Sequence, residues 1–273
     1  MINCKTKTKG LYVKILVTND DGVFTDGLQA LVKELKKIAH IVVVAPDREQ
    51  SAIGTAVTLH QPLRVRRVRP VVPEVDTYSV EGTPSDCVIL ALSTLVEDKI
   101  GMVVSGINQG ANLGDDVFIS GTVAAALQGY FRGLHALAIS IEAVGSHYLD
   151  TAAGLAALLV KWLDSSVVPN NAFLNVNVPD LPLAEIRGVK VTRLASQTHI
   201  DTAREGNNGK GKYYWLVRHR TDKSTDNQTD VWAIGQGYIS VTPLHADLFN
   251  RSAPAIPGNL SSDLLQRLRQ HQR

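Results

Sequence analysis

The sequence predicts an α/β protein with a doubly wound, mainly parallel sheet. Short apolar runs rich in β-branched residues alternate along the chain with segments whose apolar residues recur at helical spacing. The short runs stop at clusters of Gly, Asn, Asp or Pro, as buried strands do. Strands that alternate with helices pair in parallel through right-handed crossovers, so we expect a Rossmann-like sheet.

The first strands and the helix between them have the clearest pattern. Residues 15–18 and 41–45 are apolar and mostly β-branched, and Pro46 stops the second run. Residues 27–39 place apolar side chains on one helical face and lysines with a glutamate on the other. We therefore expect strand, amphipathic helix and strand in succession.

A second helix is expected to begin at Thr83. Thr83 stands as the N-cap before Pro84, and Asp86 follows three residues after the cap, which is the pattern of a capping box. The apolar residues 87–96 continue this helix, and the apolar residues 102–104 follow as a third buried strand.

The middle of the chain continues the alternation. After a Gly/Asn-rich loop over residues 105–121, small apolar residues predict a helix at 122–130. An apolar run predicts a strand at 136–141, helical spacing predicts an amphipathic helix at 149–163, and a second apolar run predicts a strand at 173–178.

The C-terminal part has a different character. A β-rich, polar excursion over about residues 195–236 surrounds the aromatic patch Tyr213–Trp215. Alternating residues predict a strand at 238–242, and leucines on one side predict a terminal helix at about 260–271. Long polar excursions usually serve function or assembly, so we expect excursion and helix to take part in oligomerisation.

Length and composition fit one α/β domain over residues 14–273, preceded by a tail at residues 1–13 that we expect to be disordered. Apolar residues make up 44% of the 273 and charged residues 20%, which is typical of a globular chain. A formal net charge of +2 argues against a nucleic-acid binder, and Arg64 and Arg66 read as one solvated strand face.

The two cysteines, Cys4 and Cys87, show no zinc-ligand spacing, and Cys87 is expected to be a small buried apolar residue. No apolar stretch follows the first lysines and no run is long enough to span a membrane. We expect a cytoplasmic protein without a membrane partner.

Polar side chains follow three of the predicted strands. Asp20 and Asp21 follow the first, Ser51 lies in the loop after the second, and the Gly/Asn-rich loop follows the third. In a parallel sheet these loops meet at one edge, where ligands bind. Carboxylate, hydroxyl and amide oxygens suit Mg²⁺, Mn²⁺ or Ca²⁺ rather than Zn²⁺. Taken alone, the Asp pair is more typical of a solvated turn.

The end of the third loop leads directly into a predicted helix. Ser120, Gly121 and Thr122 precede its small apolar residues, and a helix N-terminus of this kind can bind phosphate. An ordinary Ser or Thr N-cap explains the same residues and is favoured on this segment alone. A Walker A loop is excluded because no Gly-Lys-Ser/Thr is present.

Two further features leave alternatives open. His199 could act as a general acid, but an ordinary loop histidine is favoured. The patch Tyr213–Trp215 could stack on a base, but a hydrophobic interface is favoured.

Several motifs together resemble the SurE (stationary-phase survival protein) family of metal-dependent 5′-nucleotidases and acid phosphatases. The resemblance covers nearly everything from Lys14 to Leu244. The matching stretches are ILVTNDDG at 15–22, VVAPDREQSAIG at 43–54, EGTPSDCV at 81–88, SGINQGANLGDD at 105–116 and SGTVAAALQG at 120–129, with weaker similarity in FLNVNVP at 173–179 and GYISVTPL at 237–244.

The resemblance implies a reaction and a set of site residues. It implies hydrolysis of nucleoside 5′-monophosphates, with 3′-nucleotides and short polyphosphate accepted by some members, and one Mg²⁺ or Mn²⁺ per subunit. It also implies a homodimer or homotetramer with exchanged C-terminal segments. The implied metal ligands are Asp20, Asp21, Ser51 and Asn108, of which Asp20, Asp21 and Asn108 are also catalytic. The implied phosphate-binding residues are Asn112, Ser120, Gly121 and Thr122.

The chain departs from the family pattern at three places. Residues 1–13 precede the usual start, Gln128 stands where a glutamate is expected, and Ile119 stands where an aromatic residue is expected. Gln128 and Ile119 flank the helix after the phosphate loop, so they put substrate preference in doubt more than catalysis.

Three other functions compete with this reading. A haloacid-dehalogenase-type phosphatase needs an aspartyl nucleophile where this chain has Asn19. A non-catalytic mononucleotide-binding module remains the main alternative, although no G-x-G-x-x-G follows the first strand. A structural partner protein has no support beyond the aromatic patch.

Overall fold

The computed structural model describes most of the chain. The described residues are 14–165, 168, 171–196, 198–209, 211–220, 224–248 and 260–271. The expected N-terminal tail, residues 1–13, lies outside them.

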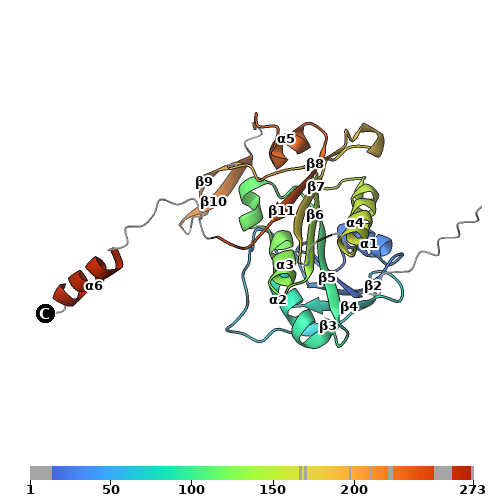
Figure 1. Ribbon diagram of the computed structural model, residues 1–273, viewed down its shortest axis with the longest axis horizontal. Helices are drawn as coiled ribbons and strands as arrows, with labels where there is room; N and C mark the ends of the chain where they lie inside the picture. Colours follow the sequence, from blue (N-terminus) through green and yellow to red (C-terminus); the bar gives the residue numbers. More distant parts are fainter. Residues whose placement is uncertain are drawn as a thin grey trace, which may run out of the picture.

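A nine-stranded sheet forms the centre of the molecule, in the order β3-β4-β2-β1-β5-β6-β7-β11-β8 (Figure 1). Neighbouring strands are parallel except at the pairs β3–β4 and β7–β11. The strands are β1 Lys14–Thr18, β2 His40–Pro46, β3 Val65–Arg67, β4 Asp76–Val80, β5 Ile100–Gln109, β6 His135–Ile141, β7 Phe173–Val178, β8 Val189–Val191 and β11 Ile239–Leu244. The expected doubly wound, mainly parallel sheet is therefore confirmed.

Helices cover both faces of the sheet. Helices α1 and α4 contribute to the larger apolar cluster on one face, whereas α2 and α3 pack together against the other. The helices are α1 Asp26–Leu35, α2 Pro84–Leu90, α3 Gly121–Tyr130, α4 Leu149–Leu163, α5 Asp230–Gly235 and α6 Leu260–His271. The core between the layers holds the strands rigidly, so the loops at their ends have defined positions.

The capping box expected at Thr83 is present. The Thr83 side chain accepts from the backbone N–H of Asp86, and the Asp86 carboxylate accepts from the backbone N–H of Thr83. The helix ends earlier than expected, because residues Ala91–Leu95 form one turn of π-helix. Cys87 lies in α2 and is fully buried, as expected.

The third strand is longer than the sequence indicated. Residues 105–109 were expected in the loop, but β5 includes them and pairs with β6 as far as Gln109, with an irregularity between Ser105 and Asn108. The Gly/Asn-rich loop therefore begins on the sheet itself. Arg64, which precedes the edge strand β3, and Arg66, which lies within it, are exposed and pair with Glu81, which agrees with a solvated face.

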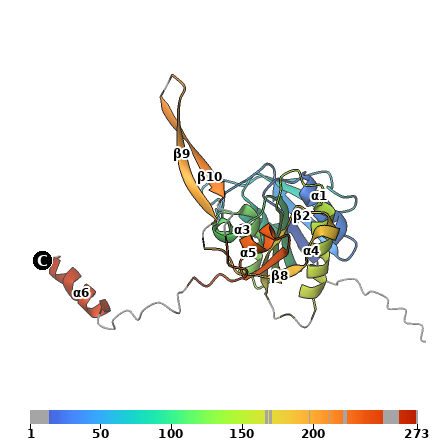
Figure 2. The same cartoon turned by 90° about the horizontal axis from the view of Figure 1, so that it is seen from above.

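The polar excursion contains a two-stranded arm that the sequence did not outline. Strands β9 His199–Asn207 and β10 Lys212–Arg220 pair antiparallel and project from the body (Figure 2). His199, which was favoured as a loop residue, begins β9 instead. Trp215 and Leu216 are exposed on this arm.

Helix α6 stands apart from the sheet and its covering helices (Figure 1). Its residues Leu264, Leu265 and Leu268 are exposed. Across the described part of the chain, none of the helices combines the length and the apolar character that crossing a membrane requires.

Candidate functional site

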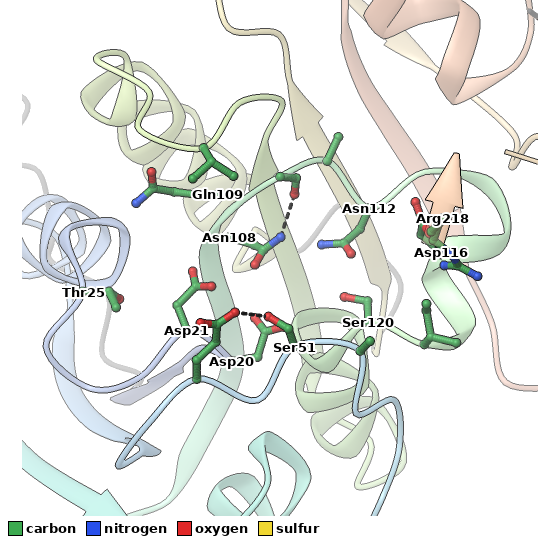
Figure 3. A pocket seen from close by; sticks show the side chains of 16 residues that line it. Asp20, Asp21, Thr25, Ser51, Asn108, Gln109, Asn112, Asp116, Ser120 and Arg218 are labelled. Carbon is green, nitrogen blue, oxygen red and sulfur yellow. Dashed lines mark hydrogen bonds and ion pairs between the residues drawn. The ribbon is translucent and has the colours of Figure 1, made fainter. Parts of the chain in front are cut away.

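A cavity of about 530 Å³ opens at the carboxyl ends of the adjacent strands β1, β2 and β5 (Figure 3). This edge is where ligands bind in open α/β sheets. Six of the eight residues proposed from the sequence line the cavity, and two do not. The six are Asp20, Asp21, Ser51, Asn108, Asn112 and Ser120.

Asp20 is held between the end of β1 and the start of α3. Its carboxylate accepts a hydrogen bond from the Thr122 hydroxyl, and its backbone carbonyl accepts one from Gln50 N–H at 2.8 Å. A Cβ atom on Gly121 would lie 2.7 Å from the Asp20 Cβ, so the close approach requires glycine at this position. Burial raises the pKa of Asp20, and the hydrogen bonds from Thr122 oppose that shift.

Asp21 lies beside Asp20 in the same cavity. Burial, followed by the charge of Asp20, raises the pKa of Asp21 from its ordinary 3.8 to about 7. The backbone N–H of Gln109 partly offsets this by hydrogen bonding to the carboxylate. Among the described residues, Oδ2 of Asp21 is buried without a hydrogen-bond partner. An ionised Asp21 therefore lacks full compensation from the protein.

These observations fit a hard divalent cation. A cation between Asp20 and Asp21 would compensate both charges, and the amide of Asn108 and the hydroxyl of Ser51 add neutral oxygen ligands. In the described part of the chain, His, Cys, Asp and Glu do not gather in groups of three that could hold a metal. The proposed set contains only two such residues, which agrees with that finding.

Ser51 lies in the loop after β2 and donates a hydrogen bond to the Glu49 carboxylate. Both side chains line the cavity, and Figure 3 shows Ser51 beside Asp20. The same loop is tied to the start of α3, because Gly54 N–H donates to the carbonyl of Ile119 at 2.8 Å. The loop position is therefore set by contacts at both of its ends.

The two asparagines are oriented by their own amide groups. Nδ2 of Asn108 donates to the carbonyl of Gly110 at 2.6 Å, which leaves its amide oxygen for the cavity (Figure 3). Nδ2 of Asn112 donates to the hydroxyl of Ser140 at 2.8 Å. The Asn112 carbonyl accepts from side-chain amides of Asn175 and Asn177 on β7.

The sequence reasoning missed the supporting role of Asn175 and Asn177. Both side chains are fully buried in a strand that is otherwise apolar. Two asparagines at alternate positions of an apolar run occupy one face of a strand. Buried amides need partners, so this pattern was an available signal for a polar network behind the site.

The start of α3 lies against Asp20 at the edge of the cavity. Ser120 is the N-cap of α3, because its Oγ accepts a hydrogen bond from Val123 N–H at 3.2 Å. The predicted N-cap is therefore confirmed. Gly121 and Thr122 do not line the cavity, and both instead lie against Asp20. The positive end of this helix therefore faces a carboxylate of the protein itself.

The two departures from the family pattern occupy different places. Ile119 lines the cavity, whereas Gln128 is buried along α3 and its side chain accepts a hydrogen bond from Arg132. Of the two, Ile119 is the one placed to touch a substrate.

The arm supplies a residue that sequence reasoning missed. Arg218 of β10 lines the cavity and donates from Nη1 to Oδ1 of Asp116 at 2.8 Å. Nδ1 of His199 lies 3.2 Å from the same oxygen of Asp116. His199 itself is not among the described residues that line the cavity. No spacing in the sequence links Arg218 to a loop about a hundred residues earlier.

The fold and the cavity together define an α/β protein with a doubly wound sheet and an acidic, oxygen-lined site at its carboxyl edge. The family description "Survival protein SurE" matches residues 15–201. The chain belongs to the SurE family, and the resemblance in its motifs is confirmed.

Curated relatives and a solved structure agree with this membership. The chain is 51% identical over 241 residues to 5′-nucleotidase SurE of Dehalococcoides mccartyi (strain ATCC BAA-2266 / KCTC 15142 / 195), covering 88% of this chain and 91% of that one. It is 46% identical to 5′-nucleotidase SurE of Legionella pneumophila (strain Paris), covering 86% and 92%. The crystal structure of the SurE protein from Aquifex aeolicus superposes with a TM-score of 0.76 at 35% identity, covering 93% and 99%.

Proposed function

We propose that this chain is a divalent-metal-dependent 5′-nucleotidase that hydrolyses nucleoside 5′-monophosphates to nucleoside and phosphate. The observation that carries the proposal is the buried, incompletely compensated pair Asp20 and Asp21 at the sheet edge. Relatives named 5′-nucleotidase SurE, which share about half of the residues, support the substrate class.

We assign one Mg²⁺ or Mn²⁺ to Asp20, Asp21, Ser51 and Asn108. When bound, such a cation supplies Lewis-acid stabilisation of phosphate charge and lowers the pKa of water. Thr122 and Gln109 orient the two carboxylates by hydrogen bonds, and Asp20, Asp21 and Asn108 are the proposed catalytic residues.

The phosphate is assigned to the cavity beside Asn112 and Ser120, whose polar side chains line it. Gly121 and Thr122 are kept in the proposed phosphate site, because both lie against Asp20 at the start of α3. We extend the proposed substrates to 3′-nucleotides and short polyphosphate, because the cavity volume of about 530 Å³ admits ligands of that size.

We further propose that residues 14–273 act as one α/β domain that assembles into a homodimer or homotetramer through the arm and α6. Exposed Trp215, Leu216 and the α6 leucines support an apolar contact between copies. Light scattering coupled to size exclusion measures the mass directly. A monomer at micromolar concentration would contradict this part of the proposal.

The experiment that tests the function is phosphate release from 5′- and 3′-mononucleotides, p-nitrophenyl phosphate and short polyphosphate. Each is assayed with EDTA, Mg²⁺ or Mn²⁺, for the wild type and Asp20→Ala. We expect metal-dependent release that the substitution abolishes, with the fold checked by circular dichroism. Mononucleotide binding without turnover in any metal would favour the non-catalytic binding module instead.

A further inference from the structure

The cavity has two ends of different chemistry. Of the described residues that line it, Arg218 is the only lysine or arginine. Figure 3 places Asp116 and Arg218 on the far side of Asn112 and Ser120 from Asp20 and Asp21, which follow β1. A substrate whose phosphate lies near Asp20 and Asp21 must direct its remaining part elsewhere, and this second end is lined by polar groups.

The guanidinium of Arg218 is held in a fixed orientation. Its Nη1 donates to Asp116 at 2.8 Å, while Nε and Nη2 donate to the Asp201 carboxylate at 2.9 and 3.3 Å. Asp201 lies directly opposite Arg218 in the arm. Within the described part of the chain, these contacts use three of the five N–H groups of the guanidinium, which leaves two donors for a ligand in the cavity.

The charge balance favours a neutral ligand group over an anion. Two carboxylates, Asp116 and Asp201, contact the positive charge of Arg218, so the described residues that line this end of the cavity carry no excess positive charge to attract a second phosphate. A fork of N–H donors beside a carboxylate that lines the cavity is suited to hydroxyl groups, which both accept and donate hydrogen bonds.

We propose that Arg218 is a specificity-determining residue that binds the sugar hydroxyls of the nucleotide, on the leaving-group side of the phosphate. The inference rests on the proposed 5′-nucleotidase function. It assigns the base of the arm to the active site, because Arg218 reaches the cavity from β10. Arg218 discriminates between phosphomonoesters by their alcohol and does not act on the phosphate.

The test compares three substrates that share a phosphate and differ in the alcohol. Adenosine 5′-monophosphate and ribose 5-phosphate carry the sugar hydroxyls, whereas p-nitrophenyl phosphate does not. The variants are Arg218→Ala and Arg218→Lys, which keeps the charge and loses the fork. Arg204→Ala is the matched control, because Arg204 is an exposed arginine of the same arm that does not line the cavity.

We expect Arg218→Ala to lower kcat/KM at least about tenfold for the two sugar phosphates, as loss of a hydrogen bond from a charged donor does. Turnover of p-nitrophenyl phosphate should stay within about twofold, which also shows that the variant is folded. Arg218→Lys should give an intermediate loss, and Arg204→Ala should behave as the wild type does.

Three results would overturn the inference while leaving the nucleotidase function in place. These are an equal loss on all three substrates, no loss on any, or a loss confined to adenosine 5′-monophosphate, which would assign Arg218 to the base. A wild type that is inactive on every substrate would instead remove the proposed function, and this inference with it.

Discussion

Asp20 and Asp21 concentrate the chemistry of the molecule in two adjacent side chains. Burial is the largest cause of the raised pKa of each, and their mutual repulsion adds to it at Asp21. A polypeptide gains no stability by burying two carboxylates together, so their placement makes sense through what they bind. At the residue scale, the two carboxylates therefore lower the stability of the metal-free protein.

Replacing Asp21 by Asn is expected to stabilise the metal-free protein. The folded-state pKa of Asp21 is raised to about 7 from 3.8, so its ionisation disfavours the folded state. The stabilisation should be absent below about pH 4, grow as the pH rises towards 7, and be complete above it. Thermal unfolding of both proteins in EDTA between pH 4 and pH 8 measures it.

The same variant should lose the increase in Tm that Mn²⁺ gives the wild type, because a ligand of the native state is weakened. Glu97→Gln serves as the control, since Glu97 is an exposed carboxylate away from the cavity. A metal-free Asp21→Asn protein less stable than the wild type at pH 8 would refute the account of this residue.

At the scale of elements, the close contact between β1 and α3 sets the geometry of the site. The first residue of α3, Gly121, packs against Asp20 at a distance that excludes a Cβ atom. Backbone ties extend this contact to the β2 loop through Gln50 and Gly54. A displacement of the end of β1, the start of α3 or the loop after β2 is therefore expected to displace the other two.

Gly121→Ala is expected to displace Asp20, lowering stability by about 1–3 kcal/mol through overpacking and abolishing most metal-dependent turnover. Gly154→Ala on α4 is the matched control. A Cβ there meets nothing within 4 Å, so alanine should stabilise the helix by about 0.5–1 kcal/mol and leave turnover unchanged. Urea unfolding measures the stability of each variant, and initial rates measure its turnover. Equal stability and equal turnover of the two variants would argue against the close contact between Gly121 and Asp20.

His135 links β6 to the residue before β7. Its Nδ1 accepts a hydrogen bond from Ala172 N–H at 3.2 Å, and burial lowers the pKa of His135 below its usual value of 6.5. The folded state thus favours the neutral ring, so this contribution to stability is present above pH 6.5 and is lost as the pH falls through the lowered pKa.

The free energy of unfolding of the wild type should therefore fall more steeply between pH 7 and pH 5 than that of His135→Gln. Urea titrations at several pH values measure the difference in slope. Parallel slopes for the two proteins would show that His135 is not protonated on unfolding in this range.

At the scale of the whole molecule, the site combines segments that differ in how visible they are in the sequence. Asp20, Asp21, Ser51 and Asn108 follow or end strands, and parallel topology alone brings such positions to one edge. Arg218 reaches the cavity because the base of the arm contacts Asp116 in the loop after β5, a tertiary contact that no local pattern encodes.

The short elements illustrate the same limit. The side chains of β9 and β10 are mostly exposed, so no buried face imposes a period of two on their sequence. Residues Ser105–Gln109 contain Gly106 and polar side chains, which indicate a loop, yet pairing with β6 keeps them in the sheet. The contacts of Gly121 and Thr122 with Asp20 join residues about a hundred positions apart, and no local pattern in the sequence indicates them.

The most direct test of the account is a Mn²⁺ titration of EDTA-treated protein, with bound metal and hydrolysis of adenosine 5′-monophosphate measured in the same samples. The account predicts no turnover without metal, recovery that parallels binding of one ion per subunit, and neither binding nor turnover in Asp20→Ala. Turnover that persists in EDTA, or that survives in Asp20→Ala, would contradict the claim that these carboxylates hold the metal on which hydrolysis depends.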